Sequence, residues 1–357
     1  MTRAVHQVIS DFASGDAMGI ITLQTQAMLR ELGFASEIYA DVIDPRLRDA
    51  SRPVARMDDE VHDGDALVYQ LGIGSPVAYR FARHRGPRVI LYHNITPPAY
   101  FRDTNPRVAA RLVAAREQLA MLAPRVELCA GVSRFNVEEM RLLGARRTAV
   151  IPPVADLRHL NPRPAQPEQP PLLLFVSRVA PNKRHDDLIR VLAALRATAQ
   201  PQARLAVVGR FDDTEDYVAA LRSLAADLGV AGAVDFTGRL DDRQVGDLYA
   251  RAAVFVSASE HEGFSVPLLE AMAFDVPVVA YAAAAVPDTV DGAGLLLRNK
   301  DPLGWAAVVD RAIGDAALRS RLIAAGRRRL QDFTPQRVRS ALGGALASIG
   351  VVPEARR

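Results

Sequence analysis

Short, mostly apolar runs alternate with helix-forming segments along most of this 357-residue chain. Such runs, without the regular polar alternation of a half-exposed strand, are typical of strands that are buried on both faces of a sheet. Because strands that alternate with helices assemble into parallel sheets covered by helices, the sequence predicts an α/β fold. The runs that we assign to strands include residues 4–10, 66–71, 88–92, 172–176 and 253–256.

A proline-rich stretch divides the chain. Residues 161–171 read NPRPAQPEQPP, which predicts a stiff and extended connector. The chain is also longer than the size at which a single core usually keeps growing. We therefore expect two domains, residues 1–160 and residues 172–357, each with its own parallel sheet. We expect the last helix to pack back on the first domain.

The composition excludes several classes of protein. With 49% hydrophobic and 24% charged residues the chain has the make-up of a globular protein, and no apolar run is long enough for a membrane-spanning helix. The first ten residues indicate a strand rather than a signal peptide, so we expect a cytoplasmic protein. The single cysteine, Cys129, excludes an internal disulfide, and we expect it in the core.

The net charge of +3 is mild and does not predict a nucleic-acid partner, since no zinc-finger spacing or aromatic–basic pattern accompanies it. Two arginine clusters, residues 327–329 and 356–357, favour a solvated surface. Contact with anionic lipid, peripherally at the inner face of a membrane, or with an acidic acceptor is the alternative.

The segment 253–273 carries the strongest functional signal. A short apolar run is followed by the loop SEHEGFS and by a helix with Pro267 in its first turn. Backbone N–H groups and the positive end of the helix dipole favour a phosphate in such a loop. Glu262 and Glu270 frame the loop, and carboxylates accept hydrogen bonds from hydroxyl groups. The segment therefore predicts a site for a nucleotide-sugar. Glu260 and His261 are too weak a pattern for a metal site.

Lysine is almost absent from the chain. Of the 44 basic residues only Lys183 and Lys300 are lysine. In a chain that uses arginine almost everywhere, a retained lysine indicates a specific role, and Lys183 follows the strand at 172–176. Lys300 has no comparable setting, and we expect it to be a loop charge.

Three ordered segments of the second half resemble the motifs of retaining glycosyltransferases of family four. They are VSRVAPNKR at 176–184 with DLI at 187–189, the paired-glutamate segment 262–270, and PVVA at 277–280. The resemblance implies the glycosyltransferase B fold, in which two Rossmann-like domains with parallel sheets face a central cleft. It also implies transfer of a sugar, with retention, from a nucleoside diphosphate sugar to an acceptor hydroxyl, without a metal or a cofactor. A glycan, a lipid-linked sugar or a small metabolite would each serve as acceptor.

The same resemblance implies roles for individual residues. Arg178 and Lys183 would neutralise the leaving diphosphate, where fixed cations stabilise the charge that develops in the transition state. Glu262 would contact hydroxyls of the donor sugar, and Glu270 those of the ribose. His93, at a strand end in the first half, would orient the donor sugar. Further donor contacts are implied for Gly209, for the backbone of Gly263, Phe264, Ser265 and Val266, and, beside the base, for Arg239 and Leu240.

The chain departs from the family pattern in two places. Its first loop has Gly15 and Gly19 where the family has adjacent glycines near the donor phosphate. We assign Gly19 to the donor, and Asp16 to the acceptor. Asp275 follows a helix where glycine is common, and aspartate tolerates the left-handed conformation that such a position requires.

Other functions remain open on the sequence. A nucleotide-sugar 2-epimerase can share this architecture, although the paired-glutamate segment favours transfer. A non-catalytic relative would bind the nucleotide-sugar without turnover. A phosphorylase would need a lysine for pyridoxal phosphate, and a dehydrogenase would need a G-x-G-x-x-G after a strand, which the sequence lacks.

Overall fold

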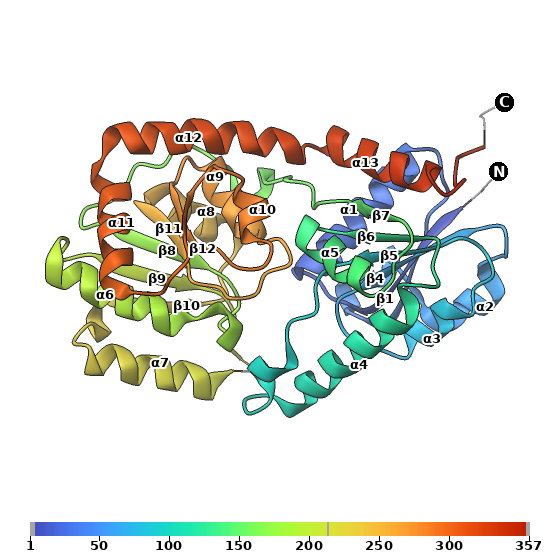
Figure 1. Ribbon diagram of the computed structural model, residues 1–357, viewed down its shortest axis with the longest axis horizontal. Coiled ribbons are helices and arrows are strands. Elements are labelled where there is room, and N and C mark those ends of the chain that lie inside the picture. The colour runs from blue at the N-terminus through green and yellow to red at the C-terminus, as the bar shows by residue number, and fades with distance from the viewer. Residues whose placement is uncertain (1–3, 213, 355–357) are drawn as a thin grey trace. The chain divides into compact units, whose positions relative to one another are not determined.

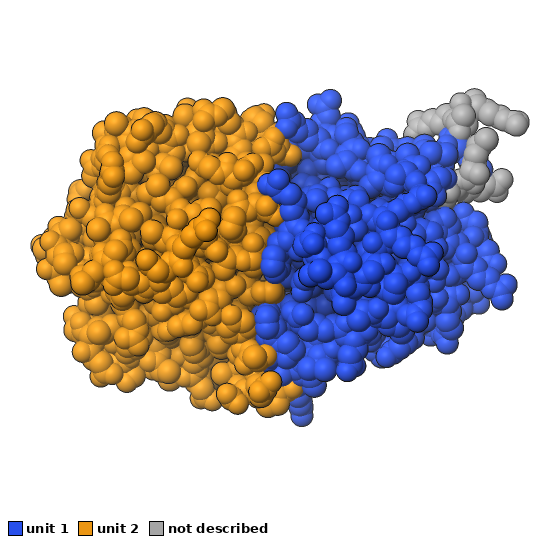
Figure 2. Space-filling view, viewed as in Figure 1, with its two compact units in different colours: residues 1–98, 107–154, 333–357 blue, residues 99–106, 155–332 orange. Residues whose placement is uncertain are grey.

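The computed structural model describes residues 4–212 and 214–354. These residues divide into two compact units, which Figure 2 shows in different colours. Unit 1 comprises residues 4–98, 107–154 and 333–354, and unit 2 comprises residues 99–106 and 155–332 apart from residue 213. The segment 99–106 therefore belongs to unit 2 although the chain on both sides of it belongs to unit 1.

Unit 1 is built on a seven-stranded sheet with the order β3-β2-β1-β4-β5-β6-β7, in which every neighbouring pair is parallel. Helices pack on both faces of the sheet (Figure 1). Every residue of β4 and nearly every residue of β1 is buried, so the core lies around these central strands. The strands are β1 Val5–Phe12, β2 Ile38–Ile43, β3 Arg52–Pro53, β4 Ala66–Leu71, β5 Arg88–Tyr92, β6 Leu128–Gly131 and β7 Thr148–Val150. The α-helices are α1 Ala17–Glu31, α2 Met57–Glu60, α3 Val77–Ala82, α4 Pro106–Leu122, α5 Arg134–Leu142 and α13 Pro335–Ala347.

Unit 2 is built on a six-stranded parallel sheet with the order β10-β9-β8-β11-β12-β13. The strands are β8 Leu172–Val176, β9 Arg204–Val208, β10 Val234–Gly238, β11 Val254–Ser257, β12 Val278–Tyr281 and β13 Leu295–Leu297. The α-helices are α6 His185–Thr198, α7 Glu215–Asp227, α8 Asp242–Arg251, α9 Val266–Ala273, α10 Val286–Val290, α11 Pro302–Gly314 and α12 Ala316–Leu330. The prediction of an α/β fold with two parallel sheets is confirmed.

In each sheet, the strand that comes first in the sequence of that unit lies in the interior of the sheet, and the strands that follow it are added first on one side of it and then on the other. In unit 1, β2 lies on one side of β1 and β4 on the other, and in unit 2, β9 lies on one side of β8 and β11 on the other. Loops that follow the two strands at such a switch point diverge, and open α/β sheets bind ligands there. In unit 2 these are the loops that carry Arg178, Lys183 and Glu262.

The proline-rich stretch lies against unit 2. The backbone N–H groups of Ala165, Gln166 and Glu168 donate to carbonyl groups of residues 274, 250 and 251 at distances of 2.8, 2.8 and 3.0 Å. This stretch is therefore fixed on unit 2 by backbone hydrogen bonds along its length.

Asp275 adopts the left-handed conformation, with φ of 58°. Its carboxylate accepts hydrogen bonds from both the Nε and the Nη2 atom of Arg327. Arg329 of the same arginine cluster lies 2.8 Å from Asp332. Two of the three arginines at 327–329 are thus engaged by carboxylates of their own unit. No helix among the residues that the structure describes is long and apolar enough to cross a membrane.

Candidate active site

The loop between β11 and α9 has the strand–loop–helix form that the sequence predicts. The helix begins at Val266 with Pro267 in its first turn, and Ser265 precedes it in the left-handed conformation with φ of 75°. The Ala285 N–H donates to the Glu262 carbonyl at 3.2 Å, and the Thr289 hydroxyl donates to the Phe264 carbonyl. These bonds to the loop's own carbonyl groups hold the backbone that precedes the helix.

Lys183 and Glu262, which the sequence assigns to the same ligand, form an ion pair. Lys183 ends the short 3-10 helix η5, Pro181–Lys183, and its Nζ lies 2.7 Å from Glu262 Oε1. Both side chains are largely buried, with 18% and 10% of their surface exposed. Asn182 ties the same two segments together, since its side chain donates to the His261 carbonyl at 3.2 Å and its carbonyl accepts from the Glu260 N–H at 3.0 Å. The structure thus places this lysine at the loop before α9.

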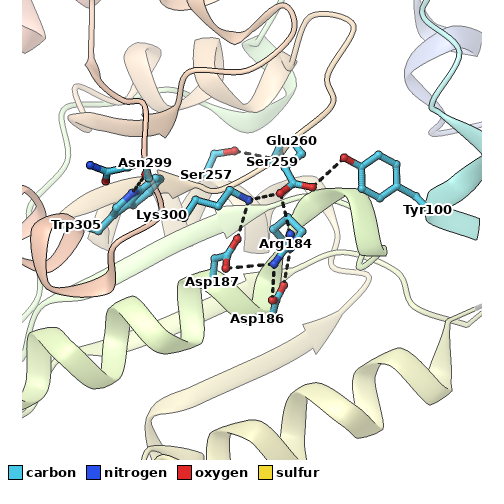
Figure 3. Close-up of polar contacts among 10 residues, drawn as sticks. All are labelled: Tyr100, Arg184, Asp186, Asp187, Ser257, Ser259, Glu260, Asn299, Lys300 and Trp305. Atoms are coloured by element: carbon cyan, nitrogen blue, oxygen red, sulfur yellow. Dashed lines mark hydrogen bonds and ion pairs between the residues drawn. The ribbon is translucent and has the colours of Figure 1, made fainter.

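Glu260 is the centre of a second set of ion pairs (Figure 3). Its Oε1 lies 2.7 Å from Lys300 Nζ and 2.8 Å from an Nη atom of Arg184, and its Oε2 accepts from the Tyr100 hydroxyl at 2.8 Å. Burial opposes ionisation of Glu260, but the hydrogen bonds from Lys300 and Tyr100 and the charges of Lys300 and Arg184 outweigh it and hold the pKa below its ordinary value. Glu260 is therefore an ionised partner of two cations.

Lys300 lies in the loop between β13 and α11, as expected, and its charge is paired there. Its Nζ also lies 2.7 Å from Asp187 and sits above the ring of Tyr281, 4.7 Å from the ring centroid. Each of the two lysines of the chain therefore pairs with a glutamate of the β11–α9 loop. The scarcity of lysine was a signal for both positions, whereas nothing in the sequence pointed to the pairing of Arg184 or Tyr100 with Glu260.

Arg178 lies in the loop that follows β8. Its guanidinium carbon is 5.5 Å from the ring centroid of Phe101, a buried residue of the segment 99–106. A guanidinium at this distance from an aromatic face is attracted by the ring quadrupole. Phe101 therefore contributes to the orientation of Arg178. Nothing in the sequence indicated that this segment joins unit 2.

Glu270 lies on α9 and accepts a hydrogen bond from the hydroxyl of the buried Tyr249, on α8, at 2.7 Å. Burial raises the pKa of Glu270 above its ordinary value, and the hydrogen bond from Tyr249 opposes the shift only in part. Among the described residues, no lysine or arginine lies within ion-pair distance of this carboxylate. Glu262, in contrast, has Lys183 at that distance. Glu262 and Glu270 therefore have opposite electrostatic settings.

The remaining predicted residues of unit 2 follow other strands at the same edge of the sheet. Gly209 directly follows β9 with φ of 149°, and a Cβ atom there would lie 1.9 Å from the Ser177 carbonyl oxygen, so only glycine fits. Arg239 and Leu240 follow β10, where Arg239 is exposed. The carboxyl ends of parallel strands share one edge, so the loops after β8, β9, β10 and β11 all open on it.

His93 and Gly19 belong to unit 1. His93 follows β5, and its Nε2 lies 2.5 Å from the side-chain oxygen of Gln70. Burial lowers the pKa of His93 to about 3, so the imidazole is neutral at physiological pH. Gly19 lies in α1, and a Cβ atom there would lie 2.4 Å from the Ala13 carbonyl oxygen. Gly19 thus allows α1 to pack against the loop before it, which is a structural reason for glycine at this position.

A hollow of ≈ 550 Å³ opens beside the Glu260 cluster. Its wall includes Tyr100 and Asp103 from the segment 99–106, Arg184 and Asp186 from the start of α6, and Tyr217 from α7. The Lys183–Glu262 pair does not line it. Among the described residues, no group of three or more histidine, cysteine or acidic side chains is arranged to hold a metal ion.

Two units with parallel sheets, and charged loops at the switch point of the second sheet, have the architecture of the glycosyltransferase B fold. Residues 159–329 match the family model described as glycosyl transferases group 1. The matched residues include all the predicted site residues of unit 2. His93 and Gly19 lie outside the match.

Relatives of known name agree with this family. The chain is 33% identical over 213 residues to a D-inositol 3-phosphate glycosyltransferase of Stackebrandtia nassauensis, which covers 56% of this chain and 48% of the relative. It is 30% identical over 271 residues to a protein of the same name from Streptosporangium roseum, with 70% and 62% coverage. The chain thus spans about half the length of the curated relatives that it matches.

Solved structures extend the likeness to nearly the whole chain. Sucrose-phosphate synthase from Thermosynechococcus elongatus has a TM-score of 0.74 at 18% identity and covers 98% of this chain and 99% of its own. Anabaena HepE, solved in complex with UDP-glucose, has a TM-score of 0.71 at 22% identity, with 96% and 99% coverage. At these identities the likeness establishes the fold.

Proposed function

We propose that this protein is a retaining glycosyltransferase, which moves a sugar from a nucleoside diphosphate sugar to an acceptor hydroxyl without a metal ion. The observation that carries the proposal is the Lys183–Glu262 ion pair at the loop that leads into α9. This arrangement puts a cation, a helix N-terminus and a hydroxyl acceptor at one place, and a sugar diphosphate needs all three.

The ion pair leaves both partners able to bind a ligand. A lysine ammonium group has three N–H donors, and the bond to Glu262 uses one of them. The other two can bind phosphate oxygens while Glu262 keeps the side chain in place. The second carboxylate oxygen of Glu262 can accept from a hydroxyl of the donor sugar. Lys183 and Glu262 can therefore serve the two parts of one donor at the same time.

In the proposed reaction the bond between the sugar C1 and the phosphate oxygen breaks, and a bond from C1 to the acceptor oxygen forms on the same face. The leaving phosphate oxygen takes the proton of the acceptor hydroxyl. Lys183 and Arg178 stabilise the charge that grows on the diphosphate, which lowers the barrier because this charge is larger in the transition state than in the bound donor. Glu270 accepts from the ribose hydroxyls, His93 orients the sugar, and the backbone of residues 263–266 binds sugar and phosphate oxygens.

The named relatives suggest where to begin the search for substrates. HepE was solved with UDP-glucose, which makes UDP-sugars the first donors to test. The relatives named D-inositol 3-phosphate glycosyltransferase make a phosphorylated polyol the first acceptor, before glycans and lipid-linked sugars.

The test has two stages. A thermal-shift screen of UDP-, GDP-, ADP- and dTDP-sugars is expected to give a selective rise in melting temperature, because a ligand that binds only the folded state stabilises it by mass action. Turnover is then followed by release of the nucleoside diphosphate, and NMR gives the anomeric configuration of the product. Retention is expected. Inversion, formation of an epimer from the donor alone, or binding without turnover with every acceptor would each overturn the proposal.

A further inference from the structure

Two glutamine side chains lie in the core of unit 1, on neighbouring strands at the switch point. Gln7 is on β1 and Gln70 is on β4, and both are fully buried. Burying an amide is costly unless its donors and acceptors are satisfied, and apolar residues would fill the same volume without this cost. A pair of amides at the centre of the sheet therefore calls for a reason other than packing.

The two amides form a chain of hydrogen bonds that ends at His93. Gln7 Nε2 donates to the Thr22 carbonyl at 3.1 Å, Gln70 Nε2 donates to Gln7 Oε1 at 2.6 Å, and Gln70 Oε1 lies 2.5 Å from His93 Nε2. The direction of this row of hydrogen bonds is fixed at the Thr22 carbonyl, because a main-chain carbonyl can only accept. If either amide were reversed, two acceptors would face each other.

The direction of the chain determines which nitrogen of His93 carries the proton. Since Gln70 presents an oxygen, the Nε2 atom must be the donor, and in a neutral imidazole the Nδ1 atom is then an acceptor. The backbone of the histidine is also held, because its N–H donates to the Leu71 carbonyl at 2.9 Å.

We propose that Gln7 and Gln70 are positioning residues, which hold His93 in the tautomer with its proton on Nε2 so that Nδ1 accepts a hydrogen bond from a hydroxyl of the donor sugar. The assignment of the tautomer depends on the structure of unit 1 alone. The assignment of the sugar hydroxyl rests on the proposed function.

The tautomer is tested without any substrate. In protein with ¹⁵N-labelled histidine, the long-range ¹H–¹⁵N couplings of the imidazole ring distinguish the two tautomers, and the His93 signals are identified by their loss in His93→Gln. The expected pattern is a single tautomer with the proton on Nε2 in the wild type. A mixture of both is expected in Gln70→Leu. We call the row of hydrogen bonds from the Thr22 carbonyl through Gln7 and Gln70 to His93 the relay. A proton on Nδ1 in the wild type, or an unchanged pattern in Gln70→Leu, would show that the relay does not set the tautomer.

Two further variants separate the relay from a general loss of packing. The double variant Gln7→Leu/Gln70→Leu removes both amides together, so it leaves no buried amide without its partner. It replaces Gln70→Leu if that single variant folds poorly. Gln118→Leu is the matched control. Gln118 is a buried glutamine of unit 1, on α4, and among the described residues its side chain forms hydrogen bonds only with the backbone of Ser75, at 2.9 and 3.1 Å. The double variant is expected to give the mixture of tautomers, and Gln118→Leu the wild-type pattern.

The sugar contact is tested by a double-mutant cycle. Gln70→Leu is expected to lower kcat/KM by about tenfold, the size of one neutral hydrogen bond. In a His93→Ala background the same change is expected to have almost no further effect, because the two residues act through one contact. Equal losses in both backgrounds would overturn the sugar contact. An enzyme that has no transferase activity but the expected tautomer would refute the proposed function and leave the relay established.

Discussion

The side chains that hold the β11–α9 loop in unit 2 are ionised, whereas the hydrogen-bonded side chains that lead to His93 in unit 1 are neutral, although Asp11 and Arg111 form an ion pair near the end of β1 in the same unit. In unit 2 the β11–α9 loop is held by Lys183 on Glu262 and by Lys300 and Arg184 on Glu260. In unit 1 the corresponding region holds two amides and an imidazole in a row. The sheets have the same local topology, so the difference lies in the side chains and not in the fold.

Under the proposed function, this difference matches the two parts of a nucleotide-sugar. A diphosphate is an anion, and a lysine that is kept charged and fixed by a carboxylate can stabilise it. A sugar hydroxyl is neutral and needs one donor or acceptor that points in the right direction, which a neutral relay supplies without adding a charge. The predictions below test whether charge matters in the first region and direction in the second.

The largest effect is expected for Lys183→Ala. We expect turnover to fall by at least ~10²-fold, because the variant removes the cation that, in the proposed reaction, acts mainly on the transition state. Lys300→Ala is the matched control, since Lys300 is the other lysine and pairs with the other glutamate of the loop. Its loss is expected to stay below about tenfold. Rates measured at saturating donor decide the point. Equal losses in the two variants would mean that both lysines act only by holding the loop.

Glu270→Gln is expected to separate stability from binding. Because burial raises the pKa of Glu270, the stability that this shift contributes is present at low pH and is lost as the pH rises from 4.5 through the folded-state value. The melting temperature of Glu270→Gln at pH 7 should therefore exceed that of the wild type. Glutamine keeps an oxygen for Tyr249 but is a weaker acceptor for ribose, so donor affinity should fall by about tenfold. Calorimetry measures both, and a variant with lower stability at pH 7 would contradict the assignment.

Glu260→Gln should change stability in the opposite direction and by a smaller amount. The pKa of Glu260 is lowered, so its contribution is present above pH 4.5 and is lost as the pH falls through the folded-state value. We expect the variant to be less stable than the wild type at pH 7, by about 1–2 kcal/mol or a few degrees in melting temperature. The gap should close below pH 4.5. A gap that stays constant in thermal scans across this range would show that the carboxylate charge is not the cause.

Local patterns in the sequence predicted the elements and the central pair of the site. The strands expected at 66–71, 88–92 and 172–176 are β4, β5 and β8 with the same bounds, because short apolar runs mark buried strands in the sequence itself. Lys183 and Glu262 were assigned to one ligand through their motifs, and the structure brings them to 2.7 Å.

Contacts that depend on tertiary neighbours were out of reach. Gln7 and Gln70 meet only because β1 and β4 are adjacent in the sheet, and they are 63 positions apart. Lys300 reaches Glu260 across 40 positions from the loop after β13. Tyr100 reaches the same carboxylate across 160 positions. No periodicity or local motif encodes which strands are neighbours, so polar groups that pair across strands and loops appear in the sequence only as isolated side chains.

The smallest effect is expected when the rates of the wild type and of His93→Gln are compared as the pH changes. This comparison tests most directly whether His93 is neutral. Burial lowers the pKa of His93 to about 3, so the ratio of the wild-type rate to the His93→Gln rate should stay constant from pH 5.5 to roughly 8.5, where the imidazole keeps one proton. A ratio that falls below pH 6.5 would show that His93 becomes charged in this range.

Gln70→Glu should convert the neutral region into a charged one. A carboxylate at position 70 would favour the imidazolium form and raise the pKa of His93, as an opposite charge at hydrogen-bond distance does. An imidazolium has protons on both nitrogens, so Nδ1 can no longer accept from a sugar hydroxyl. The variant should therefore be slow at low pH and recover as the pH rises through the raised pKa of His93, while Gln118→Leu follows the wild-type profile. If Gln70→Glu also follows that profile, a charge at His93 is tolerated, and the contrast between the two units has no consequence for catalysis.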